Sequence, residues 1–273
     1  MSRYAAMFRS ARADRSAPVI AWSVVGDPTP EAWLHTVDAL VSAGVAALEL
    51  SIAFSDPTAD GPVNQNAYSR VLGKVDKSQA VALIAQVRER YPELPIGLMT
   101  YANLVCVPSP ERFYAACAKA GVDSALVADV PVHEAWIFRD VAAAHGIETV
   151  LIAPPNAQEP ELRAIAEQSQ GFVYLVSRAG VTGTDREAQS PLSSVIATLK
   201  RYGGAPTVLG FGISRAEHVR SAITAGADGV VIGSAFAALV ADHVDDPAAL
   251  ARASAELVTE LRSGADLGAA ARQ

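Results

Sequence analysis

Two carboxylates in one stretch of the chain have the type and the spacing for acid–base chemistry. Glu49 interrupts the apolar run 45–52, and Asp60 follows it in the polar segment SDPTADGP. Burying a charge is costly, so a glutamate in such a run indicates either a structural ion pair or a functional acid. The sequence Asp60-Gly61-Pro62 is also ordinary turn chemistry. The surrounding elements must decide between these interpretations.

A repeated sequence pattern predicts the helices and strands that carry these residues. A helix-period segment ends at a glycine and a short apolar strand follows, at Gly44, Gly121, Gly146 and Gly226, as expected for glycine helix caps. The pattern predicts eight strands, over 19–25, 47–52, 96–100, 124–128, 149–152, 172–176, 207–209 and 229–232. It also predicts seven helices between them, over 31–42, 78–90, 110–119, 133–144, 159–168, 191–201 and 216–224.

Eight alternating units favour one α/β fold, a single (β/α)8 TIM barrel over residues 1–273. The chain of 273 residues has the usual size of such a barrel. An amphipathic N-terminal helix within 1–15 would plug one end, and a helical segment over 241–273 would follow the last strand. A doubly wound open sheet has the same periodicity. Polar residues at the predicted strand ends, where barrels hold their active sites, favour the barrel.

Composition excludes several classes of protein. The net charge of -7 and the absence of a basic stripe argue against nucleic acid as a partner. No apolar run is long enough to cross a membrane. The N-terminal stretch lacks the features of a secretion signal, so the expected location is cytoplasmic. Cys106 and Cys117 lack metal or redox spacing and are predicted to be small buried residues.

Two predicted strand ends are rich in glycine and favour a phosphate site. LGFGIS spans 209–214, and VIGSAF spans 231–236. Glycines let the backbone approach an anion closely, and a helix that begins at Ser234 would offer free N–H groups. Tight turns are the alternative explanation. The glycine-containing stretch 177–188 is predicted to form a loop that closes over the barrel mouth, where Gly183 would add a backbone amide.

Absent residue patterns narrow the chemistry further. The chain has four lysines, all in predicted helices or adjacent turns, so none is expected to form a Schiff base at a strand end. Its five histidines lack ligand spacing, so no metal is expected. Carboxylate acid–base catalysis remains, with help from a tyrosine hydroxyl. It suits a substrate that delocalises charge, such as an indole ring.

The stretch ELSIAFSDPTADGP resembles the signature of the tryptophan synthase alpha chain family. The resemblance continues through IGLMTYANLV, AGVDSALVADVPVHE, IAPPNA, YLVSRAGVTG, LGFGIS and VIGSAF, from about residue 4 to residue 240. It implies a (β/α)8 lyase of tryptophan biosynthesis that cleaves indole-3-glycerol phosphate to indole and glyceraldehyde 3-phosphate. It also implies a tryptophan synthase beta chain as partner in an α2β2 tetramer. No cofactor is implied for this chain, since the pyridoxal phosphate (PLP) belongs to the beta chain.

The resemblance also assigns roles to residues. Glu49 matches the acid–base group and Asp60 the acceptor of the indole N–H, while Tyr174 would lie beside the glycerol chain or, alternatively, be a barrel aromatic. The matches to the phosphate contacts are Gly183, Phe211, Gly212, Gly233 and Ser234. The indole pocket would be formed by Trp22, Met99 and Leu126, with Phe211. Loop and partner contacts are implied for Ala53, Asp56, Asn103 and Thr182.

Five positions depart from the family pattern. The family usually has phenylalanine at Trp22, glycine at Ser51, proline at Ala53 and an aliphatic residue at Asn64, and threonine is common at Val24. The departure at Ala53 concerns the stretch where family members meet the beta chain. Two alternatives therefore stay open. One is a stand-alone lyase that releases free indole, and the other is a non-catalytic barrel that binds a phosphorylated ligand.

Overall fold

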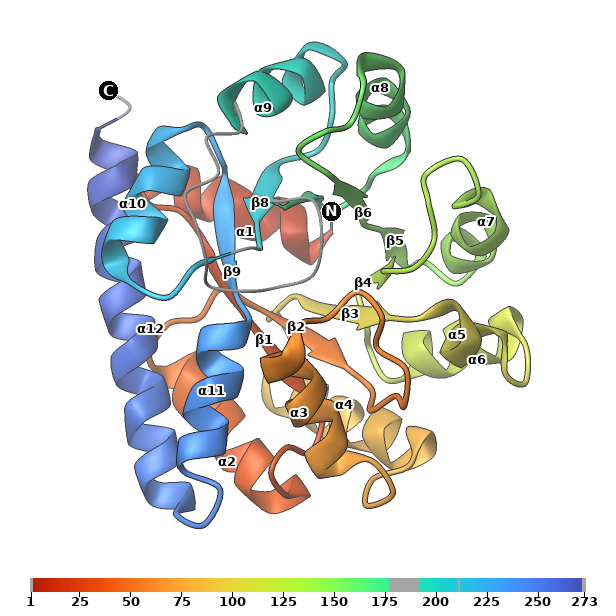
Figure 1. Ribbon diagram of the computed structural model, residues 1–273, viewed down its shortest axis with the longest axis vertical. Helices are drawn as coiled ribbons and strands as arrows, with labels where there is room; N and C mark the ends of the chain where they lie inside the picture. The colour runs from red at the N-terminus through yellow and green to blue at the C-terminus, as the bar shows by residue number, and fades with distance from the viewer. Residues whose placement is uncertain (1, 177–191, 211, 272–273) are drawn as a thin grey trace.

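A single parallel sheet forms the centre of the molecule. The structure is a computed structural model that describes residues 2–176, 192–210 and 212–271. The sheet order is β5-β4-β3-β2-β1-β9-β8-β7-β6, and helices surround it on the outside (Figure 1). The strands are β1 (Val19–Val24), β2 (Ala47–Ser51), β3 (Ile96–Thr100), β4 (Ser124–Val127), β5 (Glu148–Thr149), β6 (Leu151–Ala153), β7 (Val173–Leu175), β8 (Thr207–Leu209) and β9 (Gly229–Ile232).

Strands β5 and β6 are two halves of one strand and join the two ends of the sheet. β5 pairs with β4, whereas β6 pairs with β7. Val150 lies between the halves, and its N–H donates to the Ala125 carbonyl of β4 over 3.0 Å. The chain therefore changes neighbours without leaving the sheet. The predicted (β/α)8 TIM barrel is confirmed, and the strand predicted over 149–152 is this divided element.

The helices follow the predicted alternation, with two additions near strand ends. Those described are α1 (Arg3–Ala13), α2 (Pro30–Ser42), α3 (Pro62–Val71), α4 (Lys77–Arg90), α5 (Ala102–Cys106), α6 (Pro110–Lys119), α7 (Trp136–Ala144), α8 (Glu159–Gln168), α9 (Leu192–Arg201), α10 (Ala216–Thr224), α11 (Ser234–Asp242) and α12 (Pro247–Ala270). Helices α3 and α5 were not expected, whereas α11 begins at Ser234, as the sequence predicted. α7 begins later than predicted because residues 131–135 form turns.

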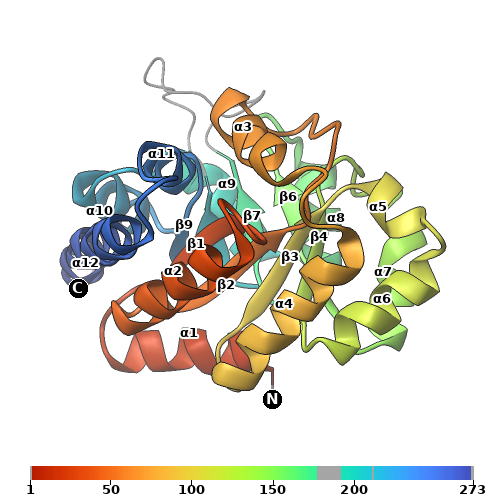
Figure 2. The same cartoon turned by 90° about the horizontal axis from the view of Figure 1, so that it is seen from below.

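Helix α1 closes one end of the barrel, as the sequence predicts. Figure 2 shows it beneath the strands. Tyr4 is buried and its hydroxyl accepts a hydrogen bond from Ser124 Oγ over 3.1 Å. Its ring packs on Phe172, with ring centroids 5.4 Å apart. Arg3 binds Asp123 at 2.7 Å and attaches the helix to the start of β4.

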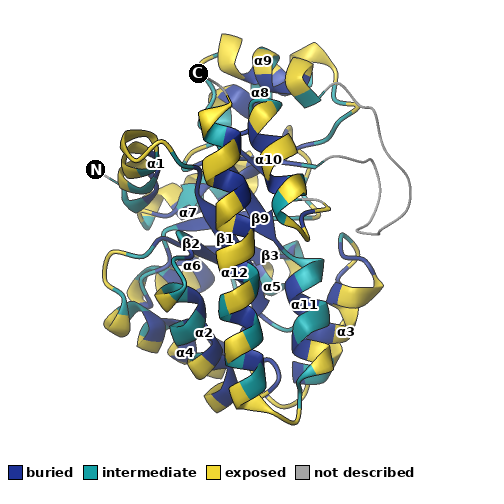
Figure 3. Cartoon of the chain, turned by 90° about the vertical axis from the view of Figure 1, so that its left-hand side faces the viewer, coloured by how far each residue is buried: buried dark blue, intermediate teal, exposed yellow. Residues whose placement is uncertain are grey.

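Helix α12 covers the outside of the barrel alongside α10, α2 and α11 (Figure 3). A methyl group at Gly264 would lie 2.1 Å from the Ala216 carbonyl oxygen, so only glycine permits this approach of α12 to α10. Cys117 is buried, but Cys106 is exposed at the end of α5, so the prediction that both are buried is wrong for Cys106. Among the described residues, no helix is long and apolar enough to span a membrane.

Candidate active site

Glu49 lies in the middle of β2, in a barrel interior that gives its charge little support. Its register neighbours are Trp22 on β1 and Gly97 on β3. The residue is 3% exposed, and its Oε2 has no hydrogen-bond partner among the described residues. Burial, and then the nearby charge of Asp60, raise the pKa of Glu49 to about 8. At neutral pH this carboxyl group therefore holds a proton that it can donate.

Asp60 is equally buried but is supplied with hydrogen-bond donors. The Tyr101 hydroxyl donates to Oδ2 over 2.5 Å, and Asn64 Nδ2 donates to Oδ1 over 2.9 Å. Burial raises the pKa of Asp60 above its usual value, and side-chain hydrogen bonds, those of Tyr101 and Asn64 foremost, oppose that rise. Hydrogen bonds to a carboxylate favour its ionised form, so of the two acids Glu49 is protonated more readily than Asp60. The two acids thus differ in the hydrogen bonds available to their ionised forms.

A buried ion pair holds the helix that follows Asp60. Arg70, near the end of α3, donates to both oxygens of Asp27, over 2.8 and 2.7 Å. Asp27 follows β1 and is 4% exposed. The same guanidinium reaches the Ala237 carbonyl in α11 over 3.4 Å. The pair therefore fixes α3, and with it Asp60, against β1 and α11. Nothing in the sequence indicated that Arg70 is the partner of Asp27.

Tyr174 lies on β7 and faces both carboxylates. Burial, and the charges of Glu49 and Asp60, raise the pKa of its hydroxyl well above the usual value, so it stays neutral. Among the described residues, the hydroxyl makes one long hydrogen bond, 3.4 Å, to the Gly210 carbonyl. A methyl group at Gly210 would lie 2.0 Å from the Tyr174 hydroxyl oxygen. Gly210 therefore provides the space for this ring, a role that the sequence did not reveal.

The predicted phosphate residues lie at the ends of two paired strands. Gly212 follows β8 with a positive φ of 74°, which favours glycine, and Gly233 follows β9. Gly233 is the N-cap of α11, so Ser234 begins a helix whose first amides have no intrahelical acceptor. A Cβ atom added at either glycine would meet no atom of the described residues within 4 Å, apart from its own chain neighbours. Gly183 and Phe211 lie outside the described residues.

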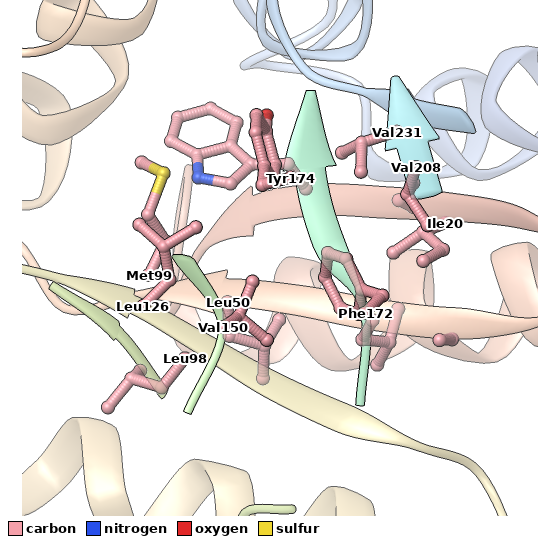
Figure 4. Packing of buried hydrophobic residues seen from close by; sticks show 14 of the residues in the cluster. Ile20, Leu50, Leu98, Met99, Leu126, Val150, Phe172, Tyr174, Val208 and Val231 are labelled. Atoms are coloured by element: carbon pink, nitrogen blue, oxygen red, sulfur yellow. The ribbon is translucent and has the colours of Figure 1, made fainter. Parts of the chain in front are cut away.

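The predicted indole pocket is formed by neighbouring strands. Met99 on β3 and Leu126 on β4 are register partners, and Figure 4 shows them next to each other on the side of the core that also holds Tyr174. Trp22, on β1, is 2% exposed and contacts Tyr68 edge to face, with ring centroids 5.9 Å apart. By register, Trp22 pairs with Glu49, and Met99 pairs with both Ser51 and Leu126, so the three residues lie on strands of the same half of the barrel as Glu49.

The predicted loop and partner contacts differ in exposure. Asp56 and Asn103 are exposed, and Ala53 is half-buried. Phe54, next to Ala53, stacks on Tyr101 with ring centroids 5.3 Å apart. The loop that would meet a partner is therefore coupled directly to the donor that binds Asp60. Thr182 and the predicted closing loop 177–188 lie outside the described residues.

The described residues contain no group of three or more His, Cys, Asp or Glu side chains that could hold a metal ion.

Known proteins share both the sequence and the fold of this chain. The family model described as "Tryptophan synthase alpha chain" matches residues 8–266. The alpha chain of Sodalis glossinidius is 43% identical over 264 residues, which cover 96% of this chain and 98% of that protein. The alpha chain of Edwardsiella ictaluri is 46% identical over 248 residues, which cover 90% and 92%.

Solved structures agree with these sequence relatives. A tryptophan synthase subunit alpha from Legionella pneumophila superposes with a TM-score of 0.87 at 26% identity, covering 97% of this chain and 99% of that one. A chain of the tryptophan synthase complex from Pyrococcus furiosus superposes with a TM-score of 0.80 at 33% identity, covering 90% and 98%.

Proposed function

The chain belongs to the tryptophan synthase alpha chain family, and we propose that it cleaves indole-3-glycerol phosphate to indole and glyceraldehyde 3-phosphate. The observation that carries the proposal is the contrast between two buried carboxylates. Glu49 Oε2 has no donor among the described residues, whereas Asp60 has two. One acid can therefore move protons while the other stays charged, which is what a retro-aldol cleavage of an indole substrate requires.

The reaction follows from these protonation states. Protonated Glu49 gives its proton to carbon 3 of the indole ring, and the positive charge that develops on the ring nitrogen is stabilised by Asp60. The Glu49 carboxylate then takes the proton of the adjacent glycerol hydroxyl. As that oxygen becomes an aldehyde, the carbon–carbon bond breaks and its electrons return to the ring. Indole leaves, and Glu49 holds a proton again.

The other site residues would bind and orient the substrate. The amides at Gly212, Gly233 and Ser234 would hold the phosphate at the helix N-terminus. The neutral Tyr174 hydroxyl, which makes one long hydrogen bond to the described residues, would turn toward the glycerol chain. The apolar side chains of Met99, Leu126 and Trp22 would exclude water from the ring. No cofactor is needed for these steps, and we propose that none is bound.

We further propose that the indole passes to a tryptophan synthase beta chain. The relative from Pyrococcus furiosus was solved as a tryptophan synthase complex. In this chain, Phe54 joins the exposed loop around Asp56 to Tyr101, and Tyr101 binds Asp60. A partner that orders this loop would therefore act on the active site. An α2β2 assembly in the cytoplasm is the arrangement expected for this role.

Indole release from indole-3-glycerol phosphate tests the reaction. The purified chain should release indole without a partner, and it should do so faster when a beta chain is added. Glu49→Gln should bind the substrate and lose turnover by at least a hundredfold, because the amide carries no transferable proton. Near-normal turnover in this variant would reject the assignment of Glu49. Full activity that a beta chain does not change would favour a stand-alone lyase, and no indole under either condition would favour a barrel that only binds.

A further inference from the structure

Asn64 is a buried polar residue whose only described side-chain partner is Asp60. It lies in the first turns of α3, four residues after Asp60, and is 4% exposed. Its Nδ2 donates to Asp60 Oδ1 over 2.9 Å, while its own Oδ1 has no hydrogen-bond partner among the described residues. Burying an amide with its oxygen unpaired lowers stability. An aliphatic side chain, usual at this position in the family, would avoid that cost.

The charge of Asp60 depends on neutral donors. Within the part of the chain that the structure describes, no lysine, arginine or histidine forms an ion pair with this carboxylate. The titratable groups that face it are Glu49 on β2, Tyr68 on α3, Tyr101 after β3 and Tyr174 on β7. Asn64 and Tyr101 donate the two short side-chain hydrogen bonds that favour the ionised form of Asp60.

We propose that Asn64 is a positioning residue that fixes the Asp60 carboxylate and keeps it ionised beside Glu49. The proposal rests on the proposed function, in which Asp60 must be charged while Glu49 holds the proton. With Oδ1 held by Asn64 and Oδ2 by Tyr101, the carboxylate plane has one orientation. Its remaining lone pairs are then directed consistently toward a ring nitrogen in the pocket. Without Asn64, the two acids compete more equally for one proton.

Substitutions at position 64 change the donor without removing Asp60. Asn64→Leu replaces the amide with an apolar group of similar size, and Asn64→Asp removes the donor and adds a like charge. Gln65→Leu is the matched control, since Gln65 on the same helix donates to the backbone carbonyl of Asp60 over 2.8 Å and not to its carboxylate. Thermal unfolding of each variant shows whether the fold is retained.

The pH profile of kcat/KM for indole formation is the first measurement. We expect the acid limb to move to higher pH in Asn64→Leu and further in Asn64→Asp. In Asn64→Leu the basic limb should stay where it is, so the active pH range becomes narrower on its acid side. At pH 6 the loss in Asn64→Leu should be about tenfold, since a hydrogen bond to a charged group is lost, and it should be smaller at pH 8. Gln65→Leu should keep the wild-type profile. An unmoved acid limb in Asn64→Leu, or an equal shift in Gln65→Leu, overturns the proposal.

A second measurement does not depend on activity. The carboxyl carbon of Asp60 can be followed by NMR in protein labelled at aspartate Cγ, with Asp60→Asn to assign the signal. We expect its titration midpoint to lie higher in Asn64→Leu than in the wild type, and an equal midpoint would reject the role of Asn64. If the wild-type chain releases no indole with or without a beta chain, the proposed function fails, and this titration still decides the inference.

Discussion

The indole N–H of Trp22 donates to Ser51 Oγ over 2.9 Å, and Ser51 Oγ in turn donates to the Met99 carbonyl over 3.1 Å. This chain of hydrogen bonds links β1, β2 and β3 beside Glu49. The family resemblance implies phenylalanine and glycine at the first two positions, and that pair could neither donate nor accept such a bond. Trp22 and Ser51, which both depart from the family pattern, therefore complement each other, because Ser51 accepts the hydrogen bond of the buried Trp22 N–H group.

A double-mutant cycle tests this coupling. Ser51→Gly leaves the buried Trp22 N–H without its acceptor and should lower the free energy of unfolding by about 2 kcal/mol. Trp22→Phe should lower it through lost packing. In the double variant the loss should be smaller than the sum, because no N–H group remains to be satisfied. Urea unfolding of the four proteins measures the coupling, and strictly additive losses would show that the residues act independently.

Glu49→Gln should make the protein more stable at alkaline pH. The folded-state pKa of Glu49 is about 8, compared with an ordinary value of 4.5, so the folded protein holds a proton that the unfolded chain releases. The wild type therefore loses stability as pH rises from about 4.5 to 8, and glutamine has no such loss. The stability difference between variant and wild type should grow over this range, by on the order of 5 kcal/mol, and then level off. Unfolding at pH 5, 7 and 9 measures it, and a constant difference would contradict the raised pKa.

Tyr101→Phe should reduce indole formation by about tenfold or more. The change removes the donor to Asp60 Oδ2 but keeps the ring that stacks on Phe54, so the thermal midpoint should move little. The reduction reflects the loss of a hydrogen bond to a charged group. Phe54→Leu is the complementary variant, because it removes the stacking and keeps the hydroxyl. Wild-type turnover in Tyr101→Phe would mean that Asp60 does not need this donor.

Asp27→Asn should destabilise the protein by about 2 kcal/mol, since it leaves the partly buried Arg70 guanidinium without its counter-charge. The matched control is Glu167→Gln, which breaks the exposed pair with Arg163 and should cost less than about 0.5 kcal/mol. Denaturant unfolding of both variants gives the comparison. Equal losses would show that the Asp27 pair does not hold α3 in place.

The spacing of apolar residues and glycines predicted the alternating strands and helices, and polar residues at the strand ends favoured the barrel over an open sheet. Strands β3, β8 and β9 and helices α6, α8 and α10 have the predicted bounds, because each is a buried run or an amphipathic stretch with a clear end. Helices α3 and α5 were missed, since both lie in loops after strands and carry polar side chains such as Asn64 and Asn103. Val150 was assigned to one strand, although its neighbours on either side pair with different strands.

The sequence by itself singled out the two candidate acids, because a glutamate in an apolar strand and an aspartate in the following loop can be recognised from their neighbours in the chain. Only the tertiary structure decided how the two acids differ. The donors to Asp60 come from α3 and from the residue after β3, and the acceptor for Trp22 comes from β2. A pKa depends on the groups packed around a carboxylate, and packing joins residues that lie far apart in the sequence.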